Sequence, residues 1–384
     1  MRDVVIVEAV RTPLGRRNGW LRETHPVRLG SQAVCAALER ANLDATLIEQ
    51  VIMGCVGQVG EQTFNLARNV VLDAGLPLEV PATTVDFQCG SSQQAVHLAA
   101  GMIASGQIEI AIAGGVENMS RIPMGSSIGS GGNPFTDRIM ADYNMIPQGI
   151  AADEIAQKWN ISREEVDEIG YESHMKAAQA AQAGYFQREI QPVAGIDEKK
   201  VPLTVTQDQG IRPTASLEKM AILDPAFTGN GVSTAGNSSQ ISDGAAALLL
   251  MTAEKAAELG LKPRARLISM VTVGSDPHLM LTGPVPATRK ALAKAGMTLD
   301  QIDLFEVNEA FAAVIAMWKR EIGADMRKVN VHGGAIALGH PLGASGARLM
   351  TTLLHALETH DKRFGLQTMC CGGGMGTGTI IERL

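Results

Sequence analysis

The chain has 384 residues, of which 45% are hydrophobic and 19% charged, a length and composition typical of a globular protein with two core-forming units. Its formal net charge of -7 offers no general attraction to a polyanion, so we expect no nucleic-acid partner. It contains no run of about 18 uncharged apolar residues, and its first residues, MRDVVIVEAVRTP, read as a strand and not as a signal peptide, so we expect neither a membrane span nor secretion.

The first third of the chain alternates predicted strands with predicted helices. Residues 37–56 read as an amphipathic helix, a short acidic turn and an apolar strand. Residues 83–103, TTVDFQCGSSQQAVHLAAGMI, run from a strand through Cys89 into a helix of small residues. Residues 108–117, IEIAIAGGVE, form a further apolar strand, which has two glycines near its end. This alternation predicts strand-helix-strand units and a buried, mainly parallel sheet.

The middle of the chain has a different pattern. The segment MGSSIGSGGNPF, residues 124–135, is a predicted loop, and residues 150–186 read as two helices. In the second of these, Ser162 is followed three residues later by Glu165, which is the capping-box pattern of a helix start. We interpret residues 120–240 as an inserted loop domain that acts as a lid.

The last third of the chain repeats the pattern of the first. An apolar strand resumes near residue 245, and residues 291–307 again read as helix, acidic turn and strand. Residues 328–350 run from a strand through His340 into a helix, and residues 365–374, GLQTMCCGGG, match the earlier strand that carries glycines. The sequence therefore predicts a duplicated, layered α/β fold. Its divisions are 1–119 plus 241–250 (N-terminal half), 120–240 (loop domain) and 251–384 (C-terminal half).

The cysteines indicate a reducing compartment. Their number is odd, their spacing fits no metal site, and two are adjacent, which disfavours a disulfide framework. We expect free thiols, no metal ion and a cytoplasmic location. The five are Cys35, Cys55, Cys89, Cys370 and Cys371.

Cys89 is a candidate nucleophile, because the pattern places its sulfur at a helix N-terminus. Unpaired N–H groups and the positive end of the helix dipole stabilise an anion there, so we predict a thiol pKa below the roughly 8.5 of free cysteine. A single cysteine at a strand end is more often inert packing, so this position alone decides nothing.

The second repeat has polar groups at the ends of its own predicted strands. These groups could act together with the Cys89 thiol. His340 is suited to take the proton of Cys89, and Cys370 offers a second acid or base. Glycines 372–374 leave backbone N–H groups free to line an oxyanion hole, and the Asn308 amide is suited to orient a water in another. Each has a structural alternative: His340 as a turn residue, Asn308 as a helix cap and the glycines as a tight bend.

Together these motifs resemble the thiolase family over nearly the whole chain. The matching segments are CGSSQQA, VENMSRIP, NEAFA, GGAIALGHPLGASGAR and MCCGGGMG, in thiolase order and spacing. The resemblance implies a duplicated five-layer α/β/α/β/α thiolase fold with an inserted CoA-binding loop domain, an acyltransferase without metal or redox cofactor, and a homodimer or homotetramer. It implies cleavage of a 3-oxoacyl-CoA by coenzyme A to acyl-CoA and acetyl-CoA, or the reverse Claisen condensation, by a ping-pong mechanism.

The resemblance also assigns roles to residues of this chain. Cys89 resembles the acylated nucleophile, His340 its base and Cys370 the second acid and base. One oxyanion hole would comprise His340 and a water held by Asn308, and the other the backbone N–H groups of Cys89 and Gly372. The implied CoA contacts are Arg212, Ser239, Phe227, Met280, Ala310 and Phe311.

Two other classes of protein share part of this pattern. A ketoacyl synthase has the duplicated fold and a helix-capping cysteine but no second reactive cysteine in a glycine loop, and a non-catalytic acyl-CoA or sterol-binding relative keeps only the tunnel. Pro147 and Gln148 stand where small-acyl thiolases have His-Met, and the segments RNGWL, DFQCGSSQQA and ASLEKMAIL are similar to thiolases of actinobacterial steroid catabolism. We therefore expect an acyl group longer or bulkier than acetoacetyl, used in degradation.

Overall fold

The computed structural model describes residues 2–128 and 132–384, so part of the predicted loop at residues 124–135 lies outside the described residues. Five strands form the sheet of the first repeat, in the order β1-β8-β5-β3-β4. Their bounds are β1 (Val4–Arg11), β3 (Gln50–Gly54), β4 (Ala82–Val85), β5 (Ile110–Asn118) and β8 (Ser242–Thr252). The helices between them are α1 (Pro26–Ala41), α2 (Leu66–Asp73) and α3 (Ser91–Ser105).

The second repeat builds the same arrangement from later residues. Its strands follow the order β9-β12-β11-β10, and a single parallel bridge from Phe305 to Val329 stands in the place that β4 has in the first repeat. The strands are β9 (Ala265–Gly274), β10 (Leu304–Val307), β11 (Phe364–Cys371) and β12 (Met375–Arg383). The helices are α9 (Pro284–Ala295), α10 (Ala312–Ile322), α11 (Ala335–Leu338) and α12 (Leu342–Thr359). The predicted duplication is confirmed.

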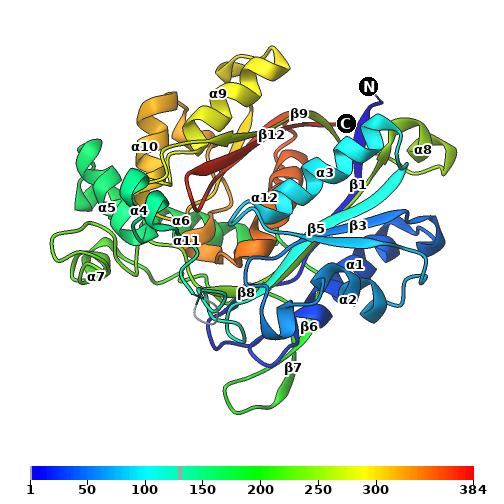
Figure 1. Cartoon of the computed structure of the whole chain (residues 1–384), viewed down its shortest axis with the longest axis horizontal. Helices are drawn as coiled ribbons and strands as arrows, with labels where there is room; N and C mark the ends of the chain where they lie inside the picture. The colour runs from blue at the N-terminus through cyan, green and yellow to red at the C-terminus, as the bar shows by residue number, and fades with distance from the viewer. Residues whose placement is uncertain (1, 129–131) are drawn as a thin grey trace.

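The two sheets and their helices form five layers. Helices α3 and α12 pack against each other between the sheets, α1 and α2 cover the outer face of the first sheet, and α9 and α10 cover that of the second (Figure 1). Antiparallel pairing of Val5 with Arg266, between β1 and β9, joins the sheets at one edge. The central helices approach the strands closely, because a Cβ on Gly115 of β5 would collide with the carbonyl oxygen of Gly343 in α12.

The prediction of mainly parallel sheets is wrong. Among the strand pairs of the described residues, only β3–β4, β3–β5 and β10–β11 are parallel, whereas β8 and β12 run antiparallel to both of their neighbours. Strand β12 follows β11 through a tight glycine turn, which forces the reversal. Strand β8 returns from the middle segment and enters between β1 and β5 from the opposite end.

The helices in the middle of the chain lie at one side of the layers, next to α10 and α11, whereas its two short strands pack against the first repeat (Figure 1). The two predicted helices are present, and the Ser162 hydroxyl accepts the N–H of Glu165 at 3.2 Å, as the capping pattern predicts. The elements here are α4 (Asp137–Tyr143), α5 (Gln148–Lys158), α6 (Arg163–Gln182), β6 (Val193–Ile196), β7 (Pro202–Val205) and α7 (Leu217–Ala221).

The remaining elements are short. They are β2 (Gly15–Arg16), α8 (Ala253–Glu258) and 3-10 turns at Ala45–Leu47, Gly60–Gln62, Leu299–Gln301 and Met326–Lys328. Within residues 2–128 and 132–384, no helix has the length and apolarity needed to cross a membrane.

Candidate active site

Cys89 lies in a strained turn between β4 and α3. Gln88, directly before it, adopts a left-handed conformation with φ of 50°, which is uncommon for a side chain of this size. Three hydrogen bonds hold this turn: Gln88 N–H to Asp86 Oδ1 (2.7 Å), Ser91 Oγ–H to the Gln88 carbonyl (2.6 Å) and Phe87 N–H to Ser91 Oγ (2.9 Å). The strain is thus fixed by the surrounding groups, and it sets the sulfur at the start of α3.

The predicted low pKa of Cys89 is wrong for the free protein. Its side chain is buried, and burial raises the pKa of the thiol to about 12, although the backbone N–H groups of Gly372 and of Cys89 itself act in the opposite direction. Loss of hydration therefore outweighs the helix terminus. The thiol is protonated at neutral pH and needs a base to become a nucleophile.

His340 is held as a neutral base with one free nitrogen. Its Nδ1 lies 2.6 Å from Ser345 Oγ, and the Ser345 hydroxyl donates its own proton to the Pro341 carbonyl at 2.8 Å. The His340 Nδ1–H must therefore donate to Ser345, which leaves Nε2 unprotonated, with a long 3.4 Å contact from the Asn308 amide nitrogen. Burial, assisted by the Arg348 cation, lowers the pKa of His340 to about 3, so the ring stays neutral at pH 7.

The path to His340 differs from the predicted strand. Only the bridge at Val329 remains of that strand, and α11 (Ala335–Leu338) intervenes before His340. The His340 backbone N–H then donates to the Gln240 carbonyl at 3.0 Å, which ties it to the segment before β8.

Asn308 follows β10 and faces the same space as His340. Its Nδ2 lies 3.4 Å from His340 Nε2, and its buried Oδ1 has no hydrogen-bond partner in the described part of the chain. The amide nitrogen thus faces the unprotonated imidazole nitrogen, and the amide oxygen is left available to hold a water. This arrangement fits an oxyanion hole that uses both residues.

Cys370 and Cys371 end β11 on opposite faces, since side chains alternate along a strand. The Cys371 sulfur packs under the turn that holds the nucleophile, 2.7 Å from where a Cβ on Gly90 would lie. Burial, together with the nearby Cys89, raises the pKa of the Cys370 thiol, so Cys370 is also protonated. After them, Gly373 and Gly374 have φ of 82° and 80°, which a side chain rarely adopts, and they form the turn into β12.

A cavity of about 560 Å³ leads to these groups. His340 and Leu342 line it, and Leu342 belongs to the apolar cluster that contains Cys89. Of the predicted CoA contacts, four line this cavity: Ser239, Phe227, Ala310 and Phe311. Two do not: Met280 is buried in the core cluster that also contains Phe311, and Arg212 is exposed on the surface.

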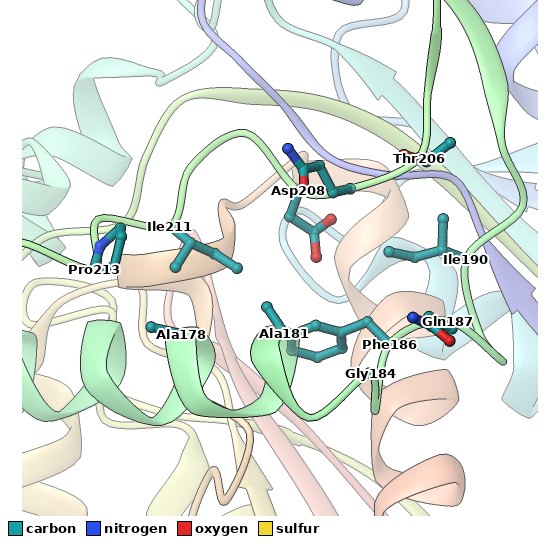
Figure 2. Close-up of a pocket in the computed structure, with 11 residues that line it drawn as sticks. Ala178, Ala181, Gly184, Phe186, Gln187, Ile190, Thr206, Asp208, Ile211 and Pro213 are labelled. Carbon is teal, nitrogen blue, oxygen red and sulfur yellow. The ribbon is translucent and has the colours of Figure 1, made fainter.

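A second pocket, of about 460 Å³, lies between α6 and residues 206–213 (Figure 2). Asp208 faces it, but its carboxylate is already bound by two Arg11 nitrogens, at 2.7 and 2.9 Å, and by the Leu14 N–H at 2.8 Å. This second pocket contains none of the predicted site residues. Across the described part of the chain, no group of three or more His, Cys, Asp or Glu side chains is placed to hold a metal ion.

Sequence reasoning missed three residues that position the site. Ser345 fixes the His340 tautomer, and Gln88 carries the strain before the nucleophile. Buried Glu117 accepts the N–H groups of Gly343 and Val56, both at 2.9 Å, and so ties the start of α12 to the first repeat. Ser345 and Glu117 both lie within the quoted motifs, but their roles depend on contacts that only the fold creates.

His278 links the wall of the cavity to the loop after β9. Its ring lies 2.8 Å from the Asn144 carbonyl and 2.7 Å from Glu154 Oε2 on α5, whose first residue, Gln148, lines the cavity. The Asn144 carbonyl, and then Glu154, raise the pKa of His278 above its usual 6.5. The protonated form is therefore favoured by folding, so its contribution to stability is complete below pH 6.5 and is lost as pH rises through the folded pKa.

We expect His278→Ala to lower Tm by about 1 to 3 °C at about pH 6, because the pair is partly exposed and screened, and by less at about pH 9. Thermal unfolding at both pH values measures the difference. His278→Gln, which cannot titrate, is the control and should differ from Ala equally at both. A deficit for His278→Ala that is the same at pH 6 and pH 9 would contradict the proposed ion pair.

Comparison with known proteins gives a consistent result. The family model described as the thiolase N-terminal domain matches residues 4–254, and that of the thiolase C-terminal domain matches residues 261–383. The chain is 47% identical to the steroid 3-ketoacyl-CoA thiolase FadA6 of Mycobacterium tuberculosis, covering 100% of this chain and 95% of the relative. It is 46% identical to the 3-ketoacyl-CoA thiolase of Aliivibrio fischeri, covering 100% of both. The solved acetyl-CoA acetyltransferase of Bacillus anthracis superposes with a TM-score of 0.93 at 38% identity, covering 100% of this chain and 99% of that one.

Proposed function

The chain belongs to the thiolase family, and we propose that it is an acyltransferase that cleaves a 3-oxoacyl-CoA with coenzyme A, or catalyses the reverse Claisen condensation. One observation carries the assignment of the site. The neutral His340 lies 3.4 Å from Asn308 and lines the cavity together with Leu342, and Leu342 shares an apolar cluster with Cys89, whose protonated thiol lies near that of Cys370. We propose these residues as the catalytic set.

In the proposed first half-reaction, the Cys89 proton passes to His340 Nε2 as the sulfur attacks the 3-keto carbon. The N–H groups of Cys89 and Gly372 stabilise the negative charge that forms on the oxygen of this 3-keto group. When the carbon-carbon bond breaks, the protonated His340 and an Asn308-bound water stabilise the enolate oxygen of the departing acetyl-CoA. Cys370 gives its proton to the enolate carbon, which completes acetyl-CoA and leaves acyl-Cys89.

The second half-reaction restores the starting protonation state of Cys89, His340 and Cys370, with the proton of coenzyme A replacing the one that Cys370 gave to acetyl-CoA. The incoming coenzyme A thiol gives its proton to the Cys370 thiolate and attacks the acyl-Cys89 carbonyl. The Cys89 sulfur leaves and takes back the proton that His340 received. In the reverse direction, Cys370 removes a proton from acetyl-CoA bound beside acyl-Cys89. The raised pKa values of both cysteines support this scheme, since both start protonated.

We propose coenzyme A and its thioesters as the only small partners, with coenzyme A as a substrate and no metal or redox cofactor. Ser239, Phe227, Ala310 and Phe311 are proposed as contacts of the pantetheine arm, because they line the cavity. Arg212 stays a proposal for the nucleotide end, where an exposed cation suits phosphate. The three-part division at residues 119, 240 and 250 and a cytoplasmic location also remain proposals.

The acyl group is proposed to be longer or bulkier than acetoacetyl. Pro147 and Gln148 replace the small-acyl signature, and Gln148 lines the cavity. We expect kcat/KM for 3-oxooctanoyl-CoA to exceed that for acetoacetyl-CoA by about tenfold, since each buried CH₂ contributes about 0.8 kcal/mol. Initial rates of thiolysis over a panel of chain lengths measure this. A tenfold preference for acetoacetyl-CoA would reverse the proposal.

A homodimer or homotetramer is proposed, with the β4 edge as the contact between subunits. Strand β4 ends the sheet with one side unpaired in the described chain, and Phe64 beside it is 88% exposed in a left-handed conformation with φ of 58°. An unpaired edge next to an exposed aromatic is a surface that folded proteins normally cover.

We expect Phe64→Asp to convert the oligomer to monomer in sedimentation velocity, because it buries a charge in that contact. The matched control is Ile222→Asp, since Ile222 is 82% exposed but lies near α7, away from β4. A Phe64→Asp protein that sediments like the wild type would place the contact elsewhere.

A further inference from the structure

Two glutamine side chains meet beside the nucleophile. Gln88 directly precedes Cys89, and Gln148 is the first residue of α5. A Cβ placed on Gly372 would lie 3.2 Å from Gln88 Oε1 and 3.6 Å from Gln148 Nε2, so both amides face the same point. The N–H of Gly372 in turn interacts with the Cys89 sulfur. Both amides therefore lie near the glycine whose N–H contacts the sulfur that we propose to carry the acyl group, and Gln148 also lines the cavity.

These two amides have unused hydrogen-bonding capacity. Both side chains are half-buried, yet neither amide forms a hydrogen bond with another group in the part of the chain that the structure describes. The backbone of Gln88 is fixed in its left-handed conformation by Asp86 and Ser91, which directs its side chain toward Gly372. Because no protein group occupies them, both amides can bind a polar atom of a ligand that enters the cavity.

The uncharged lining of the cavity limits which kind of ligand atom can bind between the two amides. No Lys, Arg, Asp or Glu is among the described residues that line the cavity, and His340 is neutral at pH 7. A carboxylate or ammonium on the acyl group would lose its hydration there without gaining an opposite charge. Burial of an uncharged oxygen costs much less hydration free energy. An alcohol fits both partners, because it can donate to Gln88 Oε1 and accept from Gln148 Nε2.

We propose that the preferred 3-oxoacyl-CoA carries a hydroxyl group on its acyl part, a few bonds from the 3-keto carbon, and that Gln88 and Gln148 bind it. This inference rests on the proposed thiolase function and adds a substrate class to it. A site that hydrogen-bonds a substrate hydroxyl disfavours the analogue that lacks it, because its own polar groups are then left unpaired. Since both amides are only half-buried, we expect discrimination of about tenfold, below the largest known values.

The test compares kcat/KM for thiolysis of two substrates of nearly equal shape, 5-hydroxy-3-oxohexanoyl-CoA and 5-methyl-3-oxohexanoyl-CoA. Wild-type protein is expected to prefer the hydroxy substrate by about tenfold, and Gln148→Met and Gln88→Met should each bring the ratio close to one. The matched control is Gln187→Met, which changes a glutamine of the second pocket and should keep the wild-type ratio.

Each outcome has a distinct meaning. A wild-type ratio of one or less, or a ratio that both Met variants leave unchanged, overturns the inference while thiolysis itself still supports the proposed function. No thiolysis of either substrate or of 3-oxohexanoyl-CoA by wild-type protein overturns the proposed function. If Gln88→Met does not fold, as judged by its circular dichroism, Gln148→Met alone decides.

Discussion

Cys89→Ala is expected to lower kcat for thiolysis by about 10⁴-fold or more, the largest effect of any single change in this chain. The alanine keeps the turn before α3 but removes the only atom that we propose to carry the acyl group. The second half-reaction then has no thioester to cleave. Loss of the 3-oxoacyl-CoA absorbance with and without coenzyme A measures the rate.

The control for this variant is Cys35→Ala, which removes a half-buried sulfur from α1. This helix covers the outer face of the first sheet and does not line the cavity. We expect it to keep kcat within about twofold of wild type, since small changes away from a site have small effects. Turnover by Cys89→Ala at more than about 1% of the wild-type rate would remove Cys89 from the mechanism.

His340→Ala is expected to lower kcat/KM by about 10³-fold, because it removes the base that we propose to take the Cys89 proton. Ser345→Ala should cost less, about tenfold, since it frees the His340 tautomer without removing the ring. Comparison of kcat/KM for the three proteins measures both effects. Equal losses for the two variants would contradict separate roles as base and positioning residue.

The pH profile gives an independent readout of His340. Because its folded pKa is about 3, below the usual 6.5, the ring remains unprotonated as the pH falls through 6.5. We therefore expect no acidic limb in kcat/KM between about pH 5 and pH 7. A limb with a midpoint near 6.5 in wild-type protein, absent from His340→Ala, would show that the free ring is not held neutral.

The elements that depend on local pattern were predictable from the sequence. Ser162 caps α6 because its hydroxyl and the Glu165 N–H are close in sequence, so no tertiary contact is needed. The repeat of helix, acidic turn and strand at 37–56 and 291–307 likewise revealed the duplication, since each copy folds by the same local rules. The direction of β8 was not predictable, because it depends on the route of the whole middle segment.

The chemistry of the site was predictable in its residue types but not in its electrostatics. Cys89, His340 and Asn308 were identified from motif and position, whereas the raised pKa of Cys89 comes from burial by segments distant in sequence. The free Nε2 of His340 depends on Ser345 and Pro341 together, a geometry that residue types do not specify. The position of Met280 in the core, away from the cavity lining, likewise depends on tertiary packing.

Every proposed role depends on one covalent step, the transfer of an acyl group to a single sulfur. Intact-protein and peptide mass spectrometry after brief incubation with acetyl-CoA, followed by acid quenching, tests this step directly. We expect one acetyl group per chain, on the peptide that contains Cys89, and its loss when coenzyme A is added. An acetyl group on Cys370 or Cys371 instead, or no adduct while thiolysis proceeds, would contradict the mechanism.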